Sequence, residues 1–126
     1  MKISQLDHLV LTVANIQASL NFYSQVLGMQ VIEFANARFA LSFGKQKINL
    51  HQKDRVFSPH AAQPVCGSGD LCLLSETPME QILIELSQHQ VEIIDGPVER
   101  KGATGKILSI YIRDPDQNLI EISNPL

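Results

Sequence analysis

The 126-residue chain contains no tryptophan, and aromatic residues make up only 6% of it. A binding groove built from stacked aromatic rings is therefore disfavoured. The chain also lacks a large excess of charge of either sign. Its net charge of −3 gives no reason to expect nucleic acid or an anionic membrane surface as a partner.

Long apolar runs and a cysteine framework are absent as well. No run approaches the length of a membrane span, and the N-terminal stretch MKISQLDHLV has no signal-peptide core. We therefore expect a cytoplasmic protein. The two cysteines, Cys66 and Cys72, are too few for a disulfide scaffold and lack CxxC spacing. We predict reduced thiols, with Cys72 buried in a strand.

The residues that are present favour one folded domain with an internal repeat. The composition, 44% hydrophobic and 18% charged, is that of a globular protein, and the length suits a single domain covering 1–126. The order strand–helix–strand–strand–strand occurs in about 3–52 and again in about 68–124, and a polar linker, 53–67, separates the halves. We expect an α+β fold in which two βαβββ modules form a curved mixed sheet, with one helix per module outside and a concave cavity inside.

Local signals place the elements of each half. In the first half, Asn15 can cap a helix that ends at Gly28, between a strand at 7–13 and three strands at 29–34, 38–43 and 47–52. In the second half, Thr77 is the expected helix cap. The strands expected there are 69–76, 90–94, 106–113 and 118–123.

Three polar residues stand among apolar neighbours in these strands. Because side chains alternate along a strand, His8, His51 and Glu121 are each expected on the side away from the helices. Two imidazoles and one carboxylate suit iron(II), manganese, nickel or zinc and leave positions open for a substrate. The alternative is that the histidines are partly exposed polar residues and that Glu121 forms a salt bridge with Arg113 or Lys106.

The longest motifs carry a family resemblance that covers nearly the whole chain. LDHLVLTVANIQASLNFYSQVLGM and SIYIRDPDQNLIEISN resemble the vicinal oxygen chelate superfamily, which includes glyoxalase I, fosfomycin-resistance thiol transferases, bleomycin-resistance proteins and extradiol dioxygenases. KINLHQK, GDLCL and GPVERKGATG are most similar to small glyoxalase-domain members, among them those like glyoxalase domain-containing protein 5 and bacterial virulence-associated relatives. The resemblance implies paired βαβββ modules with a metal in the cavity between them.

The resemblance also implies a ligand set for a divalent metal ion (zinc, nickel, manganese or iron). The first ligand falls on His8 and the last on Glu121. The fourth-strand ligand falls on Asn49 or His51, and His51 is favoured because imidazole is the better ligand. The fifth-strand ligand falls on Asp70, where the family more often has histidine. Asp70 either binds the metal, accepts a hydrogen bond from a ligand histidine or only begins the strand.

The glycine-rich segment GPVERKGATGK does not match a phosphate-binding loop, because it lacks the GxxxxGK[ST] spacing and no helix follows it. By resemblance it is a mobile wall of the substrate cavity. Arg100, Lys101 and Lys106 could then attract an anionic substrate, and Asn49, Arg100 and Lys106 are the expected substrate-binding residues. A solvated basic loop is the alternative.

We therefore expect a metal-dependent glyoxalase-like lyase or isomerase in which two substrate oxygens chelate the metal and Glu121 is both a ligand and the candidate base. One candidate substrate is the hemithioacetal of methylglyoxal and glutathione. Thiol transfer, epimerisation and iron(II) ring cleavage are alternatives on the same fold. A metal-free protein that sequesters a small molecule, like bleomycin-resistance proteins, is the other class. By resemblance we also expect a homodimer whose two sites are each shared between the chains.

Overall fold

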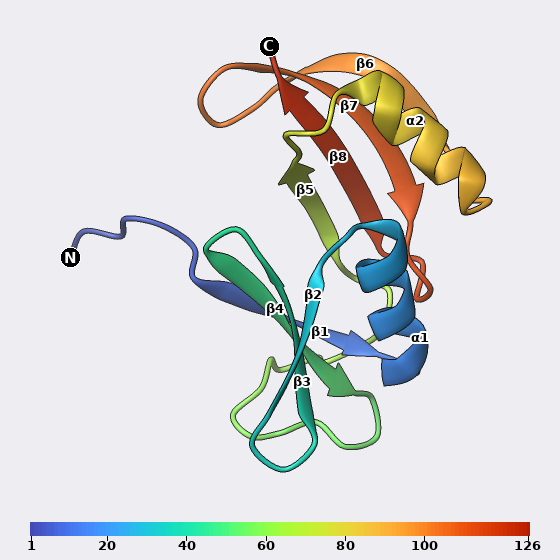
Figure 1. The fold of residues 1–126 in the computed structure, drawn as a ribbon. Coiled ribbons are helices and arrows are strands. Elements are labelled where there is room, and N and C mark those ends of the chain that lie inside the picture. The colour runs from blue at the N-terminus through green and yellow to red at the C-terminus, as the bar shows by residue number, and fades with distance from the viewer. The chain divides into compact units, whose positions relative to one another are not determined.

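The computed structural model describes residues 1–126 and separates into two compact units, Met1–Gly67 and Ser68–Leu126. Each unit holds one four-stranded mixed sheet and one α-helix (Figure 1). The strand orders are β1-β4-β3-β2 and β5-β8-β7-β6. In both units the first and last strands run parallel, and the other neighbours are antiparallel. The expected α+β fold of two βαβββ modules is confirmed, as two sheets of four strands each.

The first unit begins with an extended segment and then forms its sheet. Its elements are β1 (His8–Val13), α1 (Ile16–Asn21), the π-helical turn η1 (Phe22–Val26), β2 (Gln30–Phe34), β3 (Arg38–Phe43) and β4 (Gln46–Gln52). Asn15 caps α1 by accepting a hydrogen bond from the backbone N–H of Ala18 at 2.9 Å. Gly28 ends the helical segment with a φ of +70°, a conformation that glycine adopts at little cost.

Alternation in β1 and β4 gives the first sheet one buried and one open face. The most deeply buried side chains of these two strands are those of Leu11, Val13, Ile48 and Leu50. The residues that alternate with this buried set, which include His8 and Asn49, lie on the opposite face and are exposed or half-buried. The helical segment contributes the buried Leu20 and Tyr23 to the core of the chain.

The second unit repeats this order. Its elements are β5 (Asp70–Leu74), α2 (Met79–Gln88), β6 (Asp95–Lys101), β7 (Lys106–Arg113) and β8 (Leu119–Pro125). The helix α2 lies along one face of the sheet (Figure 1) and buries Met79, Ile82 and Leu86. The strands β7 and β8 bury Ile110, Ile112, Ile120 and Ile122, which alternation places together on one face.

The turn between β7 and β8 is held by one buried carboxylate. Asp114 Oδ1 accepts hydrogen bonds from the backbone N–H groups of Asp116 and Asn118, both at 2.9 Å, and Asp114 Oδ2 accepts from the Asn118 side chain at 2.8 Å. The Asn118 Oδ1 atom in turn accepts from the backbone N–H of Gly69. This turn therefore sets the register at the start of both β5 and β8.

Several expected details were wrong. Residues 91–94 are not a strand, and the edge strand is instead β6 (Asp95–Lys101), inside the segment expected to be a loop. The real loop is the short turn 102–105. Pro78, not Thr77, takes the cap position of α2, with no side-chain cap bond. Cys72 is exposed rather than buried, because β5 presents it on the open face.

Neither helix is both long and apolar enough to cross a membrane.

Candidate metal and substrate site

Two polar donors lie diagonally on the open face of the first sheet. His8 is the first residue of β1, and Asn49 on β4 pairs with Val10, two residues further on. From the rise along a strand and the spacing of neighbouring strands, the Cα atoms of such a pair are roughly 8 Å apart. His51 shares this face but pairs with Thr12, four residues along from His8 and roughly 14 Å away by the same spacing.

The second sheet carries a diagonal pair at the equivalent place. Asp70 is the first residue of β5, and Glu121 on β8 pairs with Cys72, two residues further on. Because β1 and β4 correspond to β5 and β8 in the repeat, Asp70 corresponds to His8 and Glu121 to Asn49. The repeat therefore favours Asn49 over His51 as the donor from the fourth strand, since His51 corresponds to Ser123.

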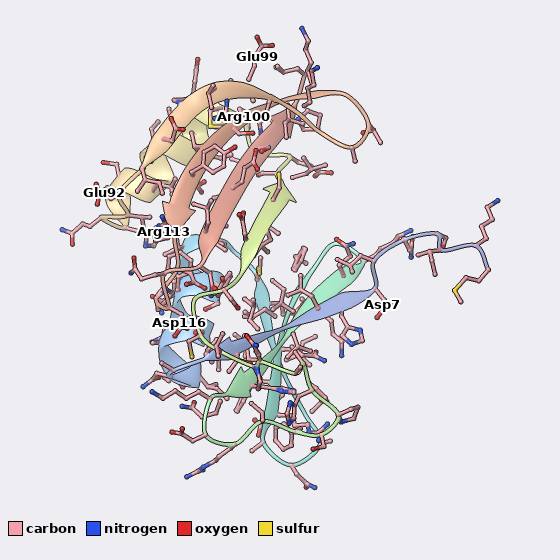
Figure 2. The ribbon with its side chains drawn as sticks, turned by 180° about the vertical axis from the view of Figure 1, so that it is seen from behind. Asp7, Glu92, Glu99, Arg100, Arg113 and Asp116 are labelled. Carbon is pink, nitrogen blue, oxygen red and sulfur yellow. The ribbon has the colours of Figure 1, made fainter.

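The ring of His8 is oriented by one contact with a neighbouring carboxylate. The Oδ2 atom of Asp7, a residue labelled in Figure 2, is 2.8 Å from His8 Nδ1. This contact favours a proton on Nδ1 and leaves the lone pair of Nε2 free. Histidines that bind metals commonly make such a bond through the other ring nitrogen.

The amide oxygen of Asn49 also lacks a partner within the chain. Its Oδ1 is buried and accepts no hydrogen bond, which costs about 1–3 kcal/mol for a group cut off from water. A cation or a donor group of a ligand would relieve this cost.

His51 lies in a cationic and aromatic surrounding. Its ring centroid is 5.5 Å from that of Phe57, and the Arg38 guanidinium carbon is 3.8 Å from the same Phe57 centroid. Burial, with the charges of Arg38 and His60, lowers the pKa of His51. The neutral imidazole is thus favoured, although its Nδ1 is buried without a hydrogen-bond partner.

The Glu121 carboxylate makes its close contact with a hydroxyl group, and its charge acts on Arg100 only at longer range. This carboxylate accepts a hydrogen bond from Ser123 Oγ at 3.5 Å, and it forms no ion pair with Arg113, Lys106 or any other residue. The Ser123 hydroxyl also lies 2.7 Å from the buried Ser109 Oγ and 3.4 Å from Cys72 Sγ. The salt-bridge explanation of this carboxylate is therefore wrong.

A cavity of about 590 Å³ opens beside Glu121 within the second unit. Its walls come from the open faces of β5 to β8 and from the 102–105 turn, and they include Leu74, Ile107 and Tyr111. A volume of this order is typical of small-molecule sites. The cavity thus gives Glu121 access to a ligand of modest size.

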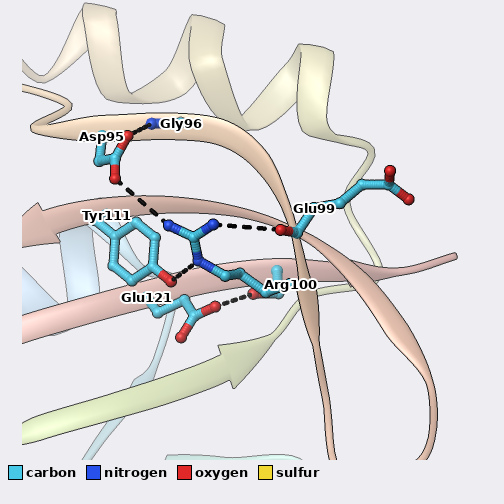
Figure 3. A network of polar contacts seen from close by, with 7 residues as sticks. Asp95, Gly96, Glu99, Arg100, Tyr111 and Glu121 are labelled. Carbon is cyan, nitrogen blue, oxygen red and sulfur yellow. Dashed lines mark hydrogen bonds and ion pairs between the residues drawn. The ribbon is translucent and has the colours of Figure 1, made fainter.

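The cavity also contains an arginine held by its neighbours (Figure 3). Arg100 Nε donates to Tyr111 Oη at 3.0 Å, and Tyr111 pairs directly with Glu121 across β7 and β8. The hydrogen bond to Tyr111 raises the pKa of Arg100 further above its already high value. Lys106 also borders the cavity, but alternation turns its side chain to the other face from Ile107.

The chain contains no group of three or more His, Cys, Asp or Glu side chains placed together to hold a metal ion. The donors present nevertheless fit a divalent cation in type, since they offer one imidazole, one amide oxygen and two carboxylates. Each unit supplies only one diagonal pair.

Comparison with known proteins gives the family. The model of the Glyoxalase/Bleomycin resistance protein/Dioxygenase superfamily matches residues 5–122. The chain belongs to this superfamily. The virulence protein STM3117 of Salmonella typhimurium is 54% identical over 123 residues, which cover 98% of this chain and 85% of that protein. Its crystal structure superposes with a TM-score of 0.98 at 52% identity and covers 100% of both chains.

A second relative comes from a fungus. The glyoxalase domain-containing protein RDO1 of Mycosarcoma maydis is 47% identical over 124 residues, which cover 98% of this chain and 70% of that protein. The superfamily resemblance expected from the sequence motifs is thereby confirmed. Because one fold of this kind supports several chemistries, the reaction has to be argued from the residues of the site.

Sequence reasoning missed three of the groups around Glu121. Tyr111, Cys72 and Ser109 share its sheet face, together with Ser123, which alternation along the last strand already places there. Applying the alternation argument to the segment KILSIYIR would have placed Ser109 and Tyr111 together. Their pairing with Glu121 required the register.

Proposed function

We propose that the protein is a metal-dependent glyoxalase-like enzyme that acts on a small substrate with two neighbouring oxygen atoms. The observation that carries this proposal is the repeated diagonal pair: His8 with Asn49 in one unit, and Asp70 with Glu121 in the other, each at the same register of its sheet. A module built only for packing has no need of polar donors at matching positions.

The proposed metal ligands are His8, Asn49 and Glu121 with Asp70, and His51 replaces Asn49 if the fourth-strand ligand is an imidazole. When bound, a divalent metal would act as a Lewis acid that stabilises negative charge on the substrate oxygens. Three of the four donors supply oxygen, which suits manganese or iron(II) better than zinc.

The residues of the chain account for the remaining chemistry. Glu121 lines the cavity and forms no ion pair, so its carboxylate is available to take a proton from the substrate. The Ser123 hydroxyl orients this carboxylate, and Leu74 and Ile107 give the cavity apolar walls. A lyase acting on the hemithioacetal of methylglyoxal and glutathione is the specific reaction proposed within this class.

Metal titration of chelator-treated protein tests the proposal. We expect saturable binding of Mn²⁺, measured by calorimetry. Glu121→Gln should weaken this binding about tenfold or more, because even substitutions of residues that only hydrogen-bond to metal ligands lower metal affinity by that factor. Glu92→Gln is the matched control, because Glu92 lies outside the cavity-lining residues. The metal-free Glu121→Gln protein should lose less than about 1 kcal/mol of stability, because no ion pair is broken.

The absence of micromolar binding of Mn²⁺, Fe²⁺, Ni²⁺ and Zn²⁺ by the folded protein would contradict the metal site. A loss of several kcal/mol in metal-free Glu121→Gln would instead make Glu121 a structural residue. In the first case, sequestration of a small molecule in the cavity becomes the better account.

A further inference from the structure

The cavity of the second unit has one charged group whose position is set before any ligand arrives. Arg100 Nε donates to Tyr111 Oη at 3.0 Å, Nη1 donates to the backbone carbonyl of Glu99 at 3.3 Å, and Nη2 lies 3.6 Å from Asp95 Oδ2. Figure 3 shows these contacts converging on the guanidinium plane. A long side chain held in this way loses less conformational freedom when it binds a ligand.

The guanidinium still has hydrogen-bonding capacity to offer. It carries five N–H donors on three nitrogens, and each nitrogen makes one contact within the chain. One N–H group on Nη1 and one on Nη2 are left for a ligand. The Arg100 side chain is 43% exposed and lines the cavity, so the unused N–H groups are accessible from it. They lie in one plane, a geometry that matches the two oxygens of a carboxylate.

The local charge favours the anionic end of a ligand at Arg100. Lys101 and Lys106 add positive charge to the cavity lining, and Asp95 at 3.6 Å offsets only part of the Arg100 charge. Glu121 shares the cavity and repels any anion that approaches its own end. The anionic end of a ligand therefore belongs at Arg100, and its uncharged end belongs near Glu121.

We propose that the cavity takes small organic acids, with the carboxylate bound by Arg100 and the reacting end turned toward Glu121. Tyr111 sets the distance between the two ends, since its backbone pairs with Glu121 and its hydroxyl holds Arg100. The apolar side chains of Leu74 and Ile107 line the space beside a short carbon chain. This inference rests on the proposed function for the role of Glu121, but carboxylate binding at Arg100 does not require a metal.

The test uses the chelator-treated full-length chain, so that its outcome does not depend on the metal site. Lactate is the probe, and lactamide is its uncharged analogue. Binding is followed by the backbone amide signals of Gly102 and Gly105 in ¹H–¹⁵N spectra, because both residues line the cavity. We expect saturable shifts with lactate and none with lactamide.

Three variants locate the binding group. Arg100→Gln should weaken lactate binding about tenfold or more, because it removes a charge-assisted pair of hydrogen bonds. Arg100→Lys keeps the charge without the planar fork and should fall between Arg100→Gln and the unmodified protein. Arg113→Gln is the matched control. Arg113, which Figure 2 labels, lies on the same face of β7 as Tyr111 but outside the cavity lining.

Unchanged lactate binding in both Arg100 variants overturns the proposal, as does equal binding of lactamide. Dispersed spectra of the variants show that they are folded, and Arg100→Lys supplies the comparison if Arg100→Gln is not. Failure of manganese binding alone, with Arg100-dependent lactate binding intact, would remove the metal chemistry and leave this acid-binding cavity.

Discussion

Glu121 belongs to a chain of polar contacts on the open face of the second sheet. Its carboxylate lies beside Ser123, and Ser123 in turn contacts the thiol of Cys72 and the hydroxyl of Ser109. The pKa of Cys72 is raised, mainly by burial of the thiol and also by the nearby charge of Glu121. The hydrogen bond from Ser123 lowers this pKa and so opposes part of the shift. At neutral pH this thiol is protonated, although the residue as a whole is exposed.

The raised pKa predicts slow modification of Cys72. In a Cys66→Ser background, we expect the rate of alkylation by iodoacetamide to reach its midpoint at higher pH than in the denatured chain, because only the thiolate reacts. Glu121→Gln should shift this midpoint to lower pH, since it removes one of the causes that raise the pKa. Cys66→Ser/Cys72→Ser is the control for background reaction.

The sign of the accompanying stability change follows from linkage. The folded chain keeps the Cys72 proton to higher pH than the unfolded chain does. The contribution of Cys72 to the free energy of unfolding is therefore fully present below the pKa of the unfolded chain, and it declines as the pH rises above about 8.5. An alkylation midpoint at or below that of the denatured chain would show that the thiol is not desolvated.

The edge strand β6 depends on one glycine. Gly96 has a φ of +93°, and a Cβ atom added there would lie 2.3 Å from the backbone oxygen of Ser109 and 3.0 Å from the Ile110 Cα. The close approach occurs where the β6–β7 register shifts between Asp95 and Val98. Only a residue without a side chain lets β6 pass this close to β7, and β6 carries Arg100 into the cavity.

Gly96→Ala should therefore destabilise the chain by at least about 2 kcal/mol, the sum of left-handed strain and a clash with backbone that cannot move aside. Urea unfolding measures the loss. Gly44→Ala is the matched control, because Gly44 also has a positive φ, +52°, but open space around its Cβ position. Its cost should stay near 1 kcal/mol, as expected for strain alone. Equal losses in the two variants would mean that the contact with β7 does not matter.

On the scale of the whole molecule, the repeat gives each unit half of the ligand set proposed above. We propose a homodimer in which His8 and Asn49 of one copy meet Asp70 and Glu121 of the other, which a two-fold axis would produce twice. Complementation tests this arrangement. His8→Ala and Glu121→Ala should each lose metal binding, and the two unfolded and refolded together should recover it.

The reason for recovery is the distribution of the substitutions. In a mixed dimer, one site carries both changes and the other carries neither, so at most one intact site returns per mixed dimer. Refolding each variant alone is the control. A mixed dimer that forms and binds no metal would place the ligands within one chain, and a chain that stays monomeric at high concentration would remove the premise.

Much of the fold was predictable because local chemistry agreed with it. Asn15 and Gly28 bound the first helical segment as expected, and alternation assigned His8 and Glu121 to the open faces. The edge strand was missed because DGPVERK contains glycine and proline, which argue against a strand. Pairing with β7 overrides that preference.

The sequence by itself determined the repeat, the superfamily and the identity of the polar residues on the open faces. These follow from the order of elements along the chain, from long motifs and from alternation within single strands. Only the tertiary structure decided which of these residues are neighbours. Strand register pairs Glu121 with Tyr111 and Cys72, brings Arg100 to the same cavity, and sets Asn49 nearer than His51 to His8. Register arises from hydrogen bonds between segments distant in the chain, and a shift of one residue would have turned each of these side chains to the opposite face.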